Sequence, residues 1–365
     1  MTVQTILFDF SVDSERTTDT KQRQEIAKVV RGEIENIFPQ VELAYQMTME
    51  DGFFCVFTEN KETMITLRIF QQGLVTLNIE YYLEDGKEPL MTFDSSKRLE
   101  NILAKKLKVH SGQVLPTLKR GDVARYFASS DERIIEYDID ALLFEERSPF
   151  QKIQILHSKT LGNMLILDEL QNIAESDLIY TETLMGRGIE NYEGKEICIL
   201  GGGDGALLYE LLKEKPKFVV MLEIDELVMQ ACNKYLNTIC GDVLEKRKGD
   251  NYEIVVGDCV EYMKKFINEN RKFDYVFGDL TDIPISGAPV GEIWDFIRTI
   301  LEHSFKILKP DGKYLTHGNG TVCTESLELF EDQLRLLRPK VNFTTSKAFV
   351  PSFMEEWLFY QVSLA

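Results

Sequence analysis

The feature that most constrains the fold of this chain of 365 residues is a glycine-rich segment, Gly201-Gly202-Gly203-Asp204-Gly205. An apolar run at 197–200 leads directly into it, and a helical pattern begins immediately after it. Glycine at a strand-to-helix junction permits positive φ angles and lets a ligand approach the backbone closely. The segment therefore predicts a nucleotide-binding loop, although a tight turn with Asp204 as the helix N-cap would also explain it.

From this loop onward, apolar segments of strand length alternate with segments of helical periodicity. The predicted strands are 197–200, 218–222, 253–256, 275–277 and 313–316, the predicted helices include 206–214 and 226–235, and a hairpin is predicted within 341–364. Strands that alternate with helices form parallel sheets with crossover helices. We therefore expect residues 174–365 to form a Rossmann-like, methyltransferase-type α/β domain with helices on both faces of the sheet.

Two smaller domains are predicted to precede this one. In residues 1–120, a strand carrying Ile6 and Phe8, a helix and a meander of strands indicate an α+β domain. In residues 121–173, alternating segments separated by turn residues indicate a small antiparallel β domain. The first of these domains shows no group of residues that suggests chemistry, so we expect it to serve dimerisation or another interaction.

Acidic residues follow the predicted strands of the large domain. Glu223 ends the second strand, about twenty residues after the glycine loop, where an acid can bind ribose hydroxyls. Asp225 lies beside it, Asp258 follows the third strand and can accept a bond from an adenine amino group, and Asp279 follows the fourth. This layout is typical of enzymes that use S-adenosylmethionine, although Glu223 could also be a strand-end carboxylate satisfied by protein groups.

Composition narrows the classes of partner. The net charge of -19 argues against nucleic-acid binding, which needs clustered Lys and Arg, and it permits a cationic ligand, although solubility alone would also explain it. The six cysteines and four histidines are scattered, so reduced thiols and no metal site are expected. No apolar run reaches the roughly 20 residues that cross a bilayer, and we expect no membrane partner and a cytoplasmic location.

Five sequence segments together resemble the aminopropyltransferase (polyamine synthase) family. They are Gly201 to Gly205, Ser148-Pro149-Phe150-Gln151, Ala174-Glu175-Ser176-Asp177 with Tyr180, Asp279-Leu280-Thr281-Asp282-Ile283-Pro284-Ile285, and Pro351-Ser352-Phe353-Met354-Glu355. Within the family, the segment that begins at Asp279 and the long amino-terminal domain resemble the animal spermine synthase branch. The resemblance implies transfer of an aminopropyl group from decarboxylated S-adenosylmethionine to spermidine, giving spermine and methylthioadenosine.

The resemblance also implies a role for each site residue. Gln151, Gly201, Gly203, Glu223, Asp225 and Asp258 match positions that hold the donor; Asp204, Asp279 and Tyr180 match the reaction centre; and Tyr180, Asp204, Asp279 and Glu355 match positions on the acceptor side. Decarboxylated S-adenosylmethionine would be a co-substrate, with no cofactor and no metal. The first domain would be related to S-adenosylmethionine decarboxylase and would form a homodimer.

The chemistry of the reaction agrees with these residue types. The donor carries a sulfonium and an ammonium but no carboxylate, so acids should surround it. The attacking amine must lose a proton although such amines have a pKa of about 10, and Asp279 is the candidate base or proton relay, with Asp204 and Tyr180 orienting the amine.

Two positions depart from the pattern of the spermine branch, which often has an acid where this chain has Leu170 and a tyrosine where it has Phe353. Asp168 or Glu169 could supply the missing charge, or both could be solvated turn residues. Three alternatives therefore stay open: a spermidine synthase or another aminopropyltransferase, a small-molecule methyltransferase, and a non-catalytic relative that binds a nucleoside.

Overall fold

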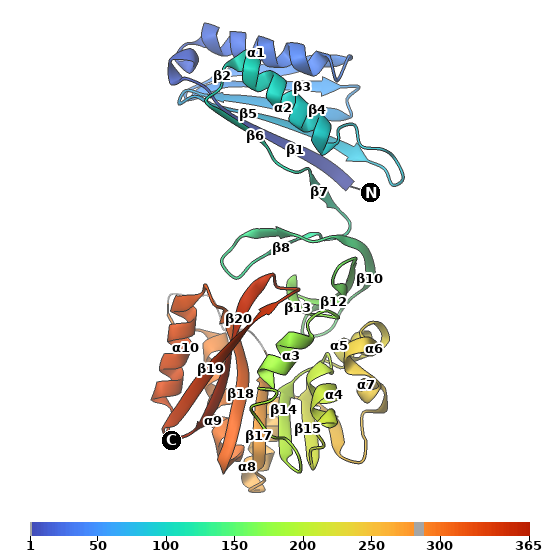
Figure 1. Ribbon diagram of the computed structural model, residues 1–365, viewed down its shortest axis with the longest axis vertical. Coiled ribbons are helices and arrows are strands. Elements are labelled where there is room, and N and C mark those ends of the chain that lie inside the picture. Colours follow the sequence, from blue (N-terminus) through green and yellow to red (C-terminus); the bar gives the residue numbers. More distant parts are fainter. Residues whose placement is uncertain (1, 281–287) are drawn as a thin grey trace. The chain divides into compact units, whose positions relative to one another are not determined.

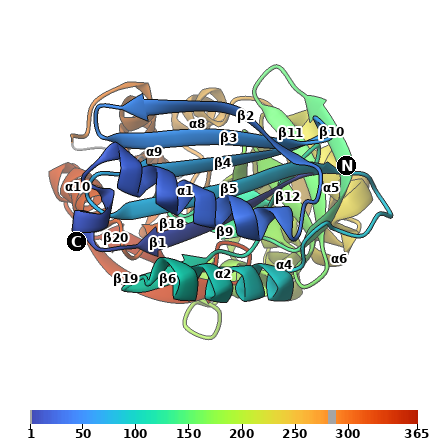
Figure 2. The same cartoon turned by 90° about the horizontal axis from the view of Figure 1, so that it is seen from above.

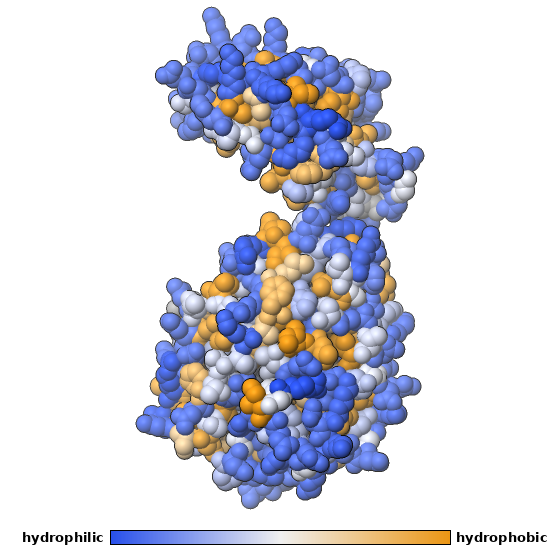
Figure 3. Space-filling view, viewed as in Figure 1, coloured by the Kyte–Doolittle hydropathy of each residue, from blue (hydrophilic) through white to orange (hydrophobic). Residues whose placement is uncertain are grey.

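The computed structural model describes residues 2–280 and 288–365, and the chain divides into two compact units, Met1–Arg125 and Tyr126–Ala365 (Figure 1). The boundary after Arg125 means that the strands assigned from sequence to a separate domain at 121–173 lie mostly in the second unit. Both units expose apolar residues among hydrophilic ones on the face shown in Figure 3.

The first unit is an antiparallel sheet covered on one face by two helices (Figure 2). The strand order is β2-β3-β4-β5-β1-β6, and β7 also pairs with β1. The elements are β1 (Thr2–Ser11), the 3-10 helix η1 (Ser14–Thr17), α1 (Thr20–Glu35), β2 (Val41–Met49), β3 (Gly52–Glu59), β4 (Thr63–Phe70), β5 (Leu74–Leu83), α2 (Phe93–Leu107), β6 (Ser111–Val114) and β7 (Leu118–Gly121).

Alternation of side chains explains how this sheet folds. Ile6, Phe8 and Phe10 of β1 are buried in the core beneath α1 and α2, because residues two apart on a strand share a face. The opposite face is less apolar and remains partly exposed. A capping box between Asp19 and Gln22 fixes where α1 begins.

The second unit begins with a hairpin, β8 (Tyr126–Ala128) and β9 (Ile134–Glu136), and a four-stranded antiparallel sheet follows. This sheet has the order β10-β11-β12-β13, with β10 (Ile139–Arg147), β11 (Lys152–Ser158), β12 (Gly162–Leu167) and β13 (Leu170–Ala174). Asp168 and Glu169 form the turn between the last two strands, and both have left-handed backbone angles, with φ of 45° and 70°. Such a two-residue turn matches the twist of a hairpin.

The main part of the second unit is a seven-stranded sheet with the order β16-β15-β14-β17-β18-β20-β19. The pairings from β16 to β18 are parallel, whereas β20 and β19 pair antiparallel at one edge. The strands are β14 (Glu196–Gly201), β15 (Phe218–Glu223), β16 (Tyr252–Val256), β17 (Phe273–Asp279), β18 (Leu308–Gly320), β19 (Val341–Val350) and β20 (Glu355–Leu364).

Helices cover both faces of this sheet (Figure 1). On one face lie α3 (Leu178–Leu184), α4 (Ala206–Lys213), α5 (Glu226–Tyr235), α6 (Asn237–Cys240) and α7 (Val243–Lys246), and on the other lie α8 (Cys259–Asn268), α9 (Glu292–Ile307) and α10 (Thr324–Leu336). Within β14, Ile197 and Ile199 pack in the first core, and Cys198 and Leu200 pack in the second. The predicted Rossmann-like α/β fold is confirmed.

The sheet also determines where a ligand can bind. β14 lies between β15 and β17, so the chain leaves the carboxyl end of β14 where the strand order changes direction. Ligands of open α/β sheets bind in the crevice at such a point.

Within the described residues, no helix combines the length and the apolar character needed to span a membrane.

Candidate active site

The glycine loop after β14 packs directly against the end of β17. The N–H of Gly202 donates to the carbonyl oxygen of Asp279 at 3.0 Å. Gly201, Gly202 and Gly205 have φ near +80°, and a Cβ at Gly201 would collide with the same carbonyl oxygen. A side chain at this position would therefore separate the two strand ends, which is why the loop needs glycine there.

The alternative that made Asp204 the helix N-cap is wrong, because Gly205 is the N-cap of α4. The Oδ1 of Asp204 accepts a hydrogen bond from the N–H of Ala206 at 2.8 Å, so Asp204 helps to begin α4. It also lines a cavity of about 410 Å³ at the carboxyl ends of the central strands. Burial raises the pKa of the Asp204 carboxyl. Asp204 therefore lies just before the cap, bonds the first residue of α4 and also faces the cavity.

The cavity brings together most of the residues that the sequence assigned to a site. Gln151, Tyr180, Gly201, Gly203, Asp204, Glu223 and Asp279 line it, together with Asp168 and Leu170. The other lining side chains are largely apolar and include Leu165, Leu167, Ile173, Leu280, Phe296 and Phe353. Acidic and apolar residues line this cavity, and none of its described lining residues is Lys or Arg.

Tyr180 and Asp279 form a pair within the cavity wall. Asp279 ends β17 directly beside Gly201, and the Tyr180 hydroxyl donates to its Oδ1 at 3.4 Å. The Tyr180 ring is held edge-on against Phe353 and Phe359, with ring centroids 5.9 and 5.3 Å away. This packing fixes the hydroxyl toward the carboxylate.

Glu223 is buried at the end of β15. Its Oε1 accepts from the N–H of Asp225 at 2.7 Å, and a Cβ at Gly203 would lie only 2.8 Å from its Oε2. Burial raises the pKa of Glu223 to about 7, and the nearby charges of Asp225 and Asp204 add to the increase. Gly203 is therefore needed for the close approach between the loop and this carboxyl.

Asp225 supports the site from behind the cavity wall. Its carboxylate is almost fully buried and accepts from the Ser148 hydroxyl at 2.6 Å, from Gln151 Nε2 at 3.0 Å and from the N–H of Leu227 at 3.1 Å. Asp225 thus caps α5 and positions the side chain of Gln151. Asp225 itself is not among the residues that line the cavity.

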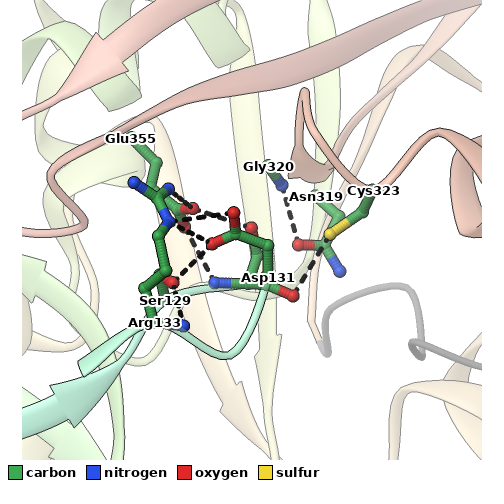
Figure 4. A network of polar contacts seen from close by, with 8 residues as sticks. Ser129, Asp131, Arg133, Asn319, Gly320, Cys323 and Glu355 are labelled. Carbon is green, nitrogen blue, oxygen red and sulfur yellow. Dashed lines mark hydrogen bonds and ion pairs between the residues drawn. The ribbon is translucent and has the colours of Figure 1, made fainter. Parts of the chain in front are cut away.

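Two other predicted residues do not line the cavity. Asp258 is exposed and caps α8 by accepting from the N–H of Val260 at 2.8 Å. Glu355 is buried and bound to Ser130 and Arg133 of the β8–β9 hairpin (Figure 4). The structure therefore does not place these two acids with the cavity carboxylates.

Of the two acids that could replace the acid missing at Leu170, the structure brings only Asp168 to the cavity. Asp168 lines the cavity, but its Oδ1 accepts from the N–H of Lys152 at 2.9 Å, which makes it part of the turn. Glu169 does not line the cavity. Residues 281–287, which include most of the motif that begins at Asp279, lie outside the described residues.

Sequence reasoning missed part of the wall. Phe296 of α9 and His317 of β18 line the cavity although neither belongs to a motif. Leu165 and Leu167 could have been assigned to the wall from the sequence, because residues two apart on strand β12 share one face. Phe296 could not, because its position depends on how α9 packs against the sheet.

Comparison with known families decides the class of this protein. Residues 177–364 match the family described as spermine/spermidine synthase domain, and residues 126–175 match the spermidine synthase tetramerisation domain. The chain belongs to the spermine/spermidine synthase family. The predicted aminopropyltransferase family is thereby confirmed, and the two matched ranges both fall in the second unit.

Individual relatives agree with this family. A polyamine aminopropyltransferase of Pyrococcus abyssi is 30% identical over 225 residues, which are 60% of this chain and 75% of the relative. A thermospermine synthase of Arabidopsis thaliana is 28% identical over 60% of this chain and 64% of the relative.

Solved structures agree with the fold. A spermidine synthase of Thermotoga maritima has a TM-score of 0.54 at 22% identity, with 67% of this chain and 80% of that chain covered. A spermidine synthase in complex with the transition state analogue AdoDATO has a TM-score of 0.56 at 22% identity, over 67% and 81% of the two chains. At this identity the likeness concerns the fold.

Proposed function

We propose that this aminopropyltransferase transfers the aminopropyl group of decarboxylated S-adenosylmethionine to spermidine and releases spermine and methylthioadenosine. The observation that carries the proposal is the pair of Tyr180 and Asp279, which faces the same cavity as Asp204 and the glycine loop. The acids suit a donor with a positively charged tail. A methyltransferase would need a partner for the methionine carboxylate, and the described lining offers no Lys or Arg for it.

In this proposal the donor lies over the glycine loop. Gln151 and Glu223 hold the ribose hydroxyls, and Gly201 and Gly203 permit the close approach of the nucleoside. Asp258, which does not line the cavity, would have to contact adenine from outside it. Asp225 acts through Gln151, because its carboxylate is already occupied by protein donors. The donor is a co-substrate, and the proposed reaction requires neither a cofactor nor a metal.

The reaction is a displacement at carbon. The nitrogen lone pair of the acceptor attacks the propyl carbon next to the sulfonium, a carbon–nitrogen bond forms, and the carbon–sulfur bond breaks. Its electron pair goes to sulfur, which leaves as the neutral thioether of methylthioadenosine. Asp279 takes the proton that the acceptor nitrogen must lose, and Tyr180 and Asp204 orient the amine.

We also propose that the protein is a homodimer formed through residues 1–125, a unit whose fold would be related to S-adenosylmethionine decarboxylase. The sheet face opposite the helices supports this proposal. Tyr45 and Met47 of the edge strand β2 are exposed and pair with Val56 and Phe54 of β3. An edge strand has unpaired backbone groups, and together with exposed apolar side chains these can pair with another chain.

A competition assay tests the proposed acceptor. The protein is given decarboxylated S-adenosylmethionine with equal concentrations of spermidine and putrescine, and the products are separated by chromatography. Faster consumption of spermidine supports the proposal. Faster consumption of putrescine would point to a spermidine synthase, an alternative favoured by the apolar side chains of Leu170 and Phe353 on the wall. No reaction with either amine would refute the proposed function.

A further inference from the structure

The first unit has a cavity of its own, between the helix α1 and the strands β2 and β3. The volume of this cavity is about 260 Å³. Figure 2 shows β2 and β3 running beside α1, on the side away from α2. The second helix therefore does not cover this part of the sheet face. The proposed reaction uses none of the residues that line the cavity.

The floor of this cavity is apolar. Phe53, Cys55 and Phe57 lie at alternate positions of β3, share the sheet face beneath the helices and are almost completely buried. Ala27 of α1 is also buried and lines the cavity on the helix side. Because Ala27 and Cys55 have small side chains, they leave space that larger residues would fill. This space suits the apolar part of a ligand.

An irregularity in β2 provides a further wall. Leu43 pairs with Phe57 and Gln46 pairs with Cys55, and the register shifts between Leu43 and Tyr45. Residues three apart on a regular strand lie on opposite faces, but the extra residue brings Leu43 and Gln46 to the same face. Both side chains line the cavity. This wall therefore offers one apolar side chain and one amide.

Two basic residues lie at the rim of the cavity. Lys28 and Arg31 are three positions apart on α1, so their side chains are neighbours on the helix surface. Lys28 is exposed and forms no ion pair with any residue that the structure describes. Arg31 donates from Nε to Glu35 at 2.7 Å, which leaves the terminal nitrogens of its guanidinium for another acceptor. The rim therefore favours an anion.

The charge of this cavity is opposite to that of the candidate active site. Acids and no described Lys or Arg line the active-site cavity, whereas Lys28 and Arg31 and no described acid line the cavity beside α1. The whole chain has a net charge of -19, so its overall composition does not explain a basic cavity. The two cavities should therefore bind ligands of opposite charge.

We infer that the cavity beside α1 binds a small carboxylate with an apolar body. The apolar body lies against Phe53 and Phe57, and the carboxylate accepts hydrogen bonds from Lys28 and Arg31. Sites for drug-sized ligands begin near roughly 300 Å³, so a cavity of about 260 Å³ suits a small molecule. The inference does not depend on the proposed function, because no step of the aminopropyl transfer involves the first unit.

Two probes of the same shape test the preference for an anion. They are 2-naphthoate and 2-naphthylmethanol, which carry a carboxylate and a neutral hydroxyl on the same ring system. Calorimetry on the full chain should give at least about tenfold tighter binding of the carboxylate. An excess of 2-naphthylmethylammonium, whose positive charge suits the acidic cavity, should not displace the carboxylate, and neither should methylthioadenosine.

Variants of α1 locate the binding. Lys28→Gln and Arg31→Gln each remove one positive charge, so each should weaken 2-naphthoate about three- to tenfold and change the alcohol by less than about twofold. Ala27→Met fills the cavity and should weaken both probes by more than about tenfold. Lys21→Gln is the matched control, because it removes an exposed charge from the same helix at a position that does not line the cavity.

The charge variants keep the test decisive if Ala27→Met fails to fold. In the wild type, 2-naphthoate should then raise the unfolding temperature of the first unit, and it should do so less in Lys28→Gln than in Lys21→Gln. Absence of 2-naphthoate binding, equal binding of the carboxylate and the alcohol, or displacement by the ammonium analogue or by methylthioadenosine would overturn the inference. Charge variants that bind 2-naphthoate as tightly as the control would overturn it too.

Discussion

Replacing Glu223 by glutamine should move protein stability and nucleoside affinity in opposite directions at pH 8. Burial raises the pKa of this carboxyl from 4.5 to about 7. The folded state therefore binds the proton more tightly than the unfolded state, so the contribution of Glu223 to stability is fully present below pH 4.5 and is lost as the pH rises to about 7. Above that pH, the ionised carboxylate costs up to about 3 kcal/mol of stability.

The glutamine removes this cost and keeps the local geometry. Its amide oxygen can still accept the bond from the N–H of Asp225, which is 2.7 Å from Oε1. We expect the variant to be more stable than the wild type by about 1 to 3 kcal/mol at pH 8. About one pH unit or more below 4.5 the two proteins should be almost equally stable, because the wild-type carboxyl is then largely protonated in both the folded and the unfolded state.

Affinity should change the other way, because the proposed contact between Glu223 and the ribose hydroxyls loses its charge. Such a bond contributes about 1.5 to 3 kcal/mol, which corresponds to a roughly ten- to hundredfold weaker methylthioadenosine complex. Wild-type affinity should also fall about tenfold from pH 8 to pH 6 as Glu223 takes up its proton, whereas the variant should show little pH dependence.

Calorimetry and thermal unfolding at several pH values measure both effects. The chain has two units, so the relevant transition is the one that methylthioadenosine shifts upward. The control is Glu253→Gln on the neighbouring strand β16, a partly exposed carboxylate paired with Lys248 at 3.3 Å, which should change stability by less than about 0.5 kcal/mol. A Glu223 variant with wild-type stability at pH 8 would refute the cost of burial, and an unchanged affinity would refute the ribose contact.

Three further predictions concern the reaction centre, the acceptor and the first unit. Asp279→Asn should reduce turnover by a factor of about 100 or more while calorimetry shows methylthioadenosine binding nearly intact, because shape is kept and the proton acceptor is lost. Leu170→Asp should lower the spermidine KM about three- to tenfold and leave the putrescine KM unchanged in steady-state assays, since a longer amine has an additional ammonium to pair. Deletion of residues 1–125 should give a monomer of lower activity in sedimentation and product assays, whereas a fully active dimer would contradict the role proposed for this unit.

The sheet of the second unit could be predicted because its central strands are recognisable from their own short apolar runs. Ile197 and Ile199 point to one core and Cys198 and Leu200 to the other, so residues 197–200 of β14 are all apolar, which is typical of a buried parallel strand. β2 was not predicted. Its residues are mostly exposed and it exists because its backbone pairs with β3, which is a contact that the local sequence of β2 does not reveal.

The sequence predicted which acids follow the strands, but not whether each acid contacts a ligand or caps a helix. An acid at the end of a parallel strand precedes a helix, and the same position suits a ligand contact and a helix cap. Asp225 and Asp258 cap α5 and α8, whereas Glu223 and Asp279 face the cavity. Sequence spacing treats these acids alike, and the contacts that distinguish them come from residues distant in the chain, as Ser148 does for Asp225.

The location of Glu355 shows the same limit over a longer distance. Its partner Ser130 lies 225 positions earlier, in a hairpin whose three-residue strands are too short to give a periodic pattern. A motif at the end of the chain indicated that this acid matters. It did not indicate whether the carboxylate faces a ligand or another part of the protein, because a buried acid requires donors in either case.

The buried carboxyl groups also bear on how an amine can lose its proton in this cavity. In water, an ammonium with a pKa of about 10 and a carboxyl with a pKa of about 4 differ by roughly six units, or about 8 kcal/mol, against proton transfer. Burial lowers the pKa of an amine and raises that of a carboxyl, so both shifts reduce this difference. The raised pKa of Asp204 and of Glu223 shows that burial outweighs the bonds that their oxygens accept. Under the proposed function, Asp204 lines the same cavity as Asp279, so burial of the acceptor amine there would reduce the free-energy cost of removing its proton.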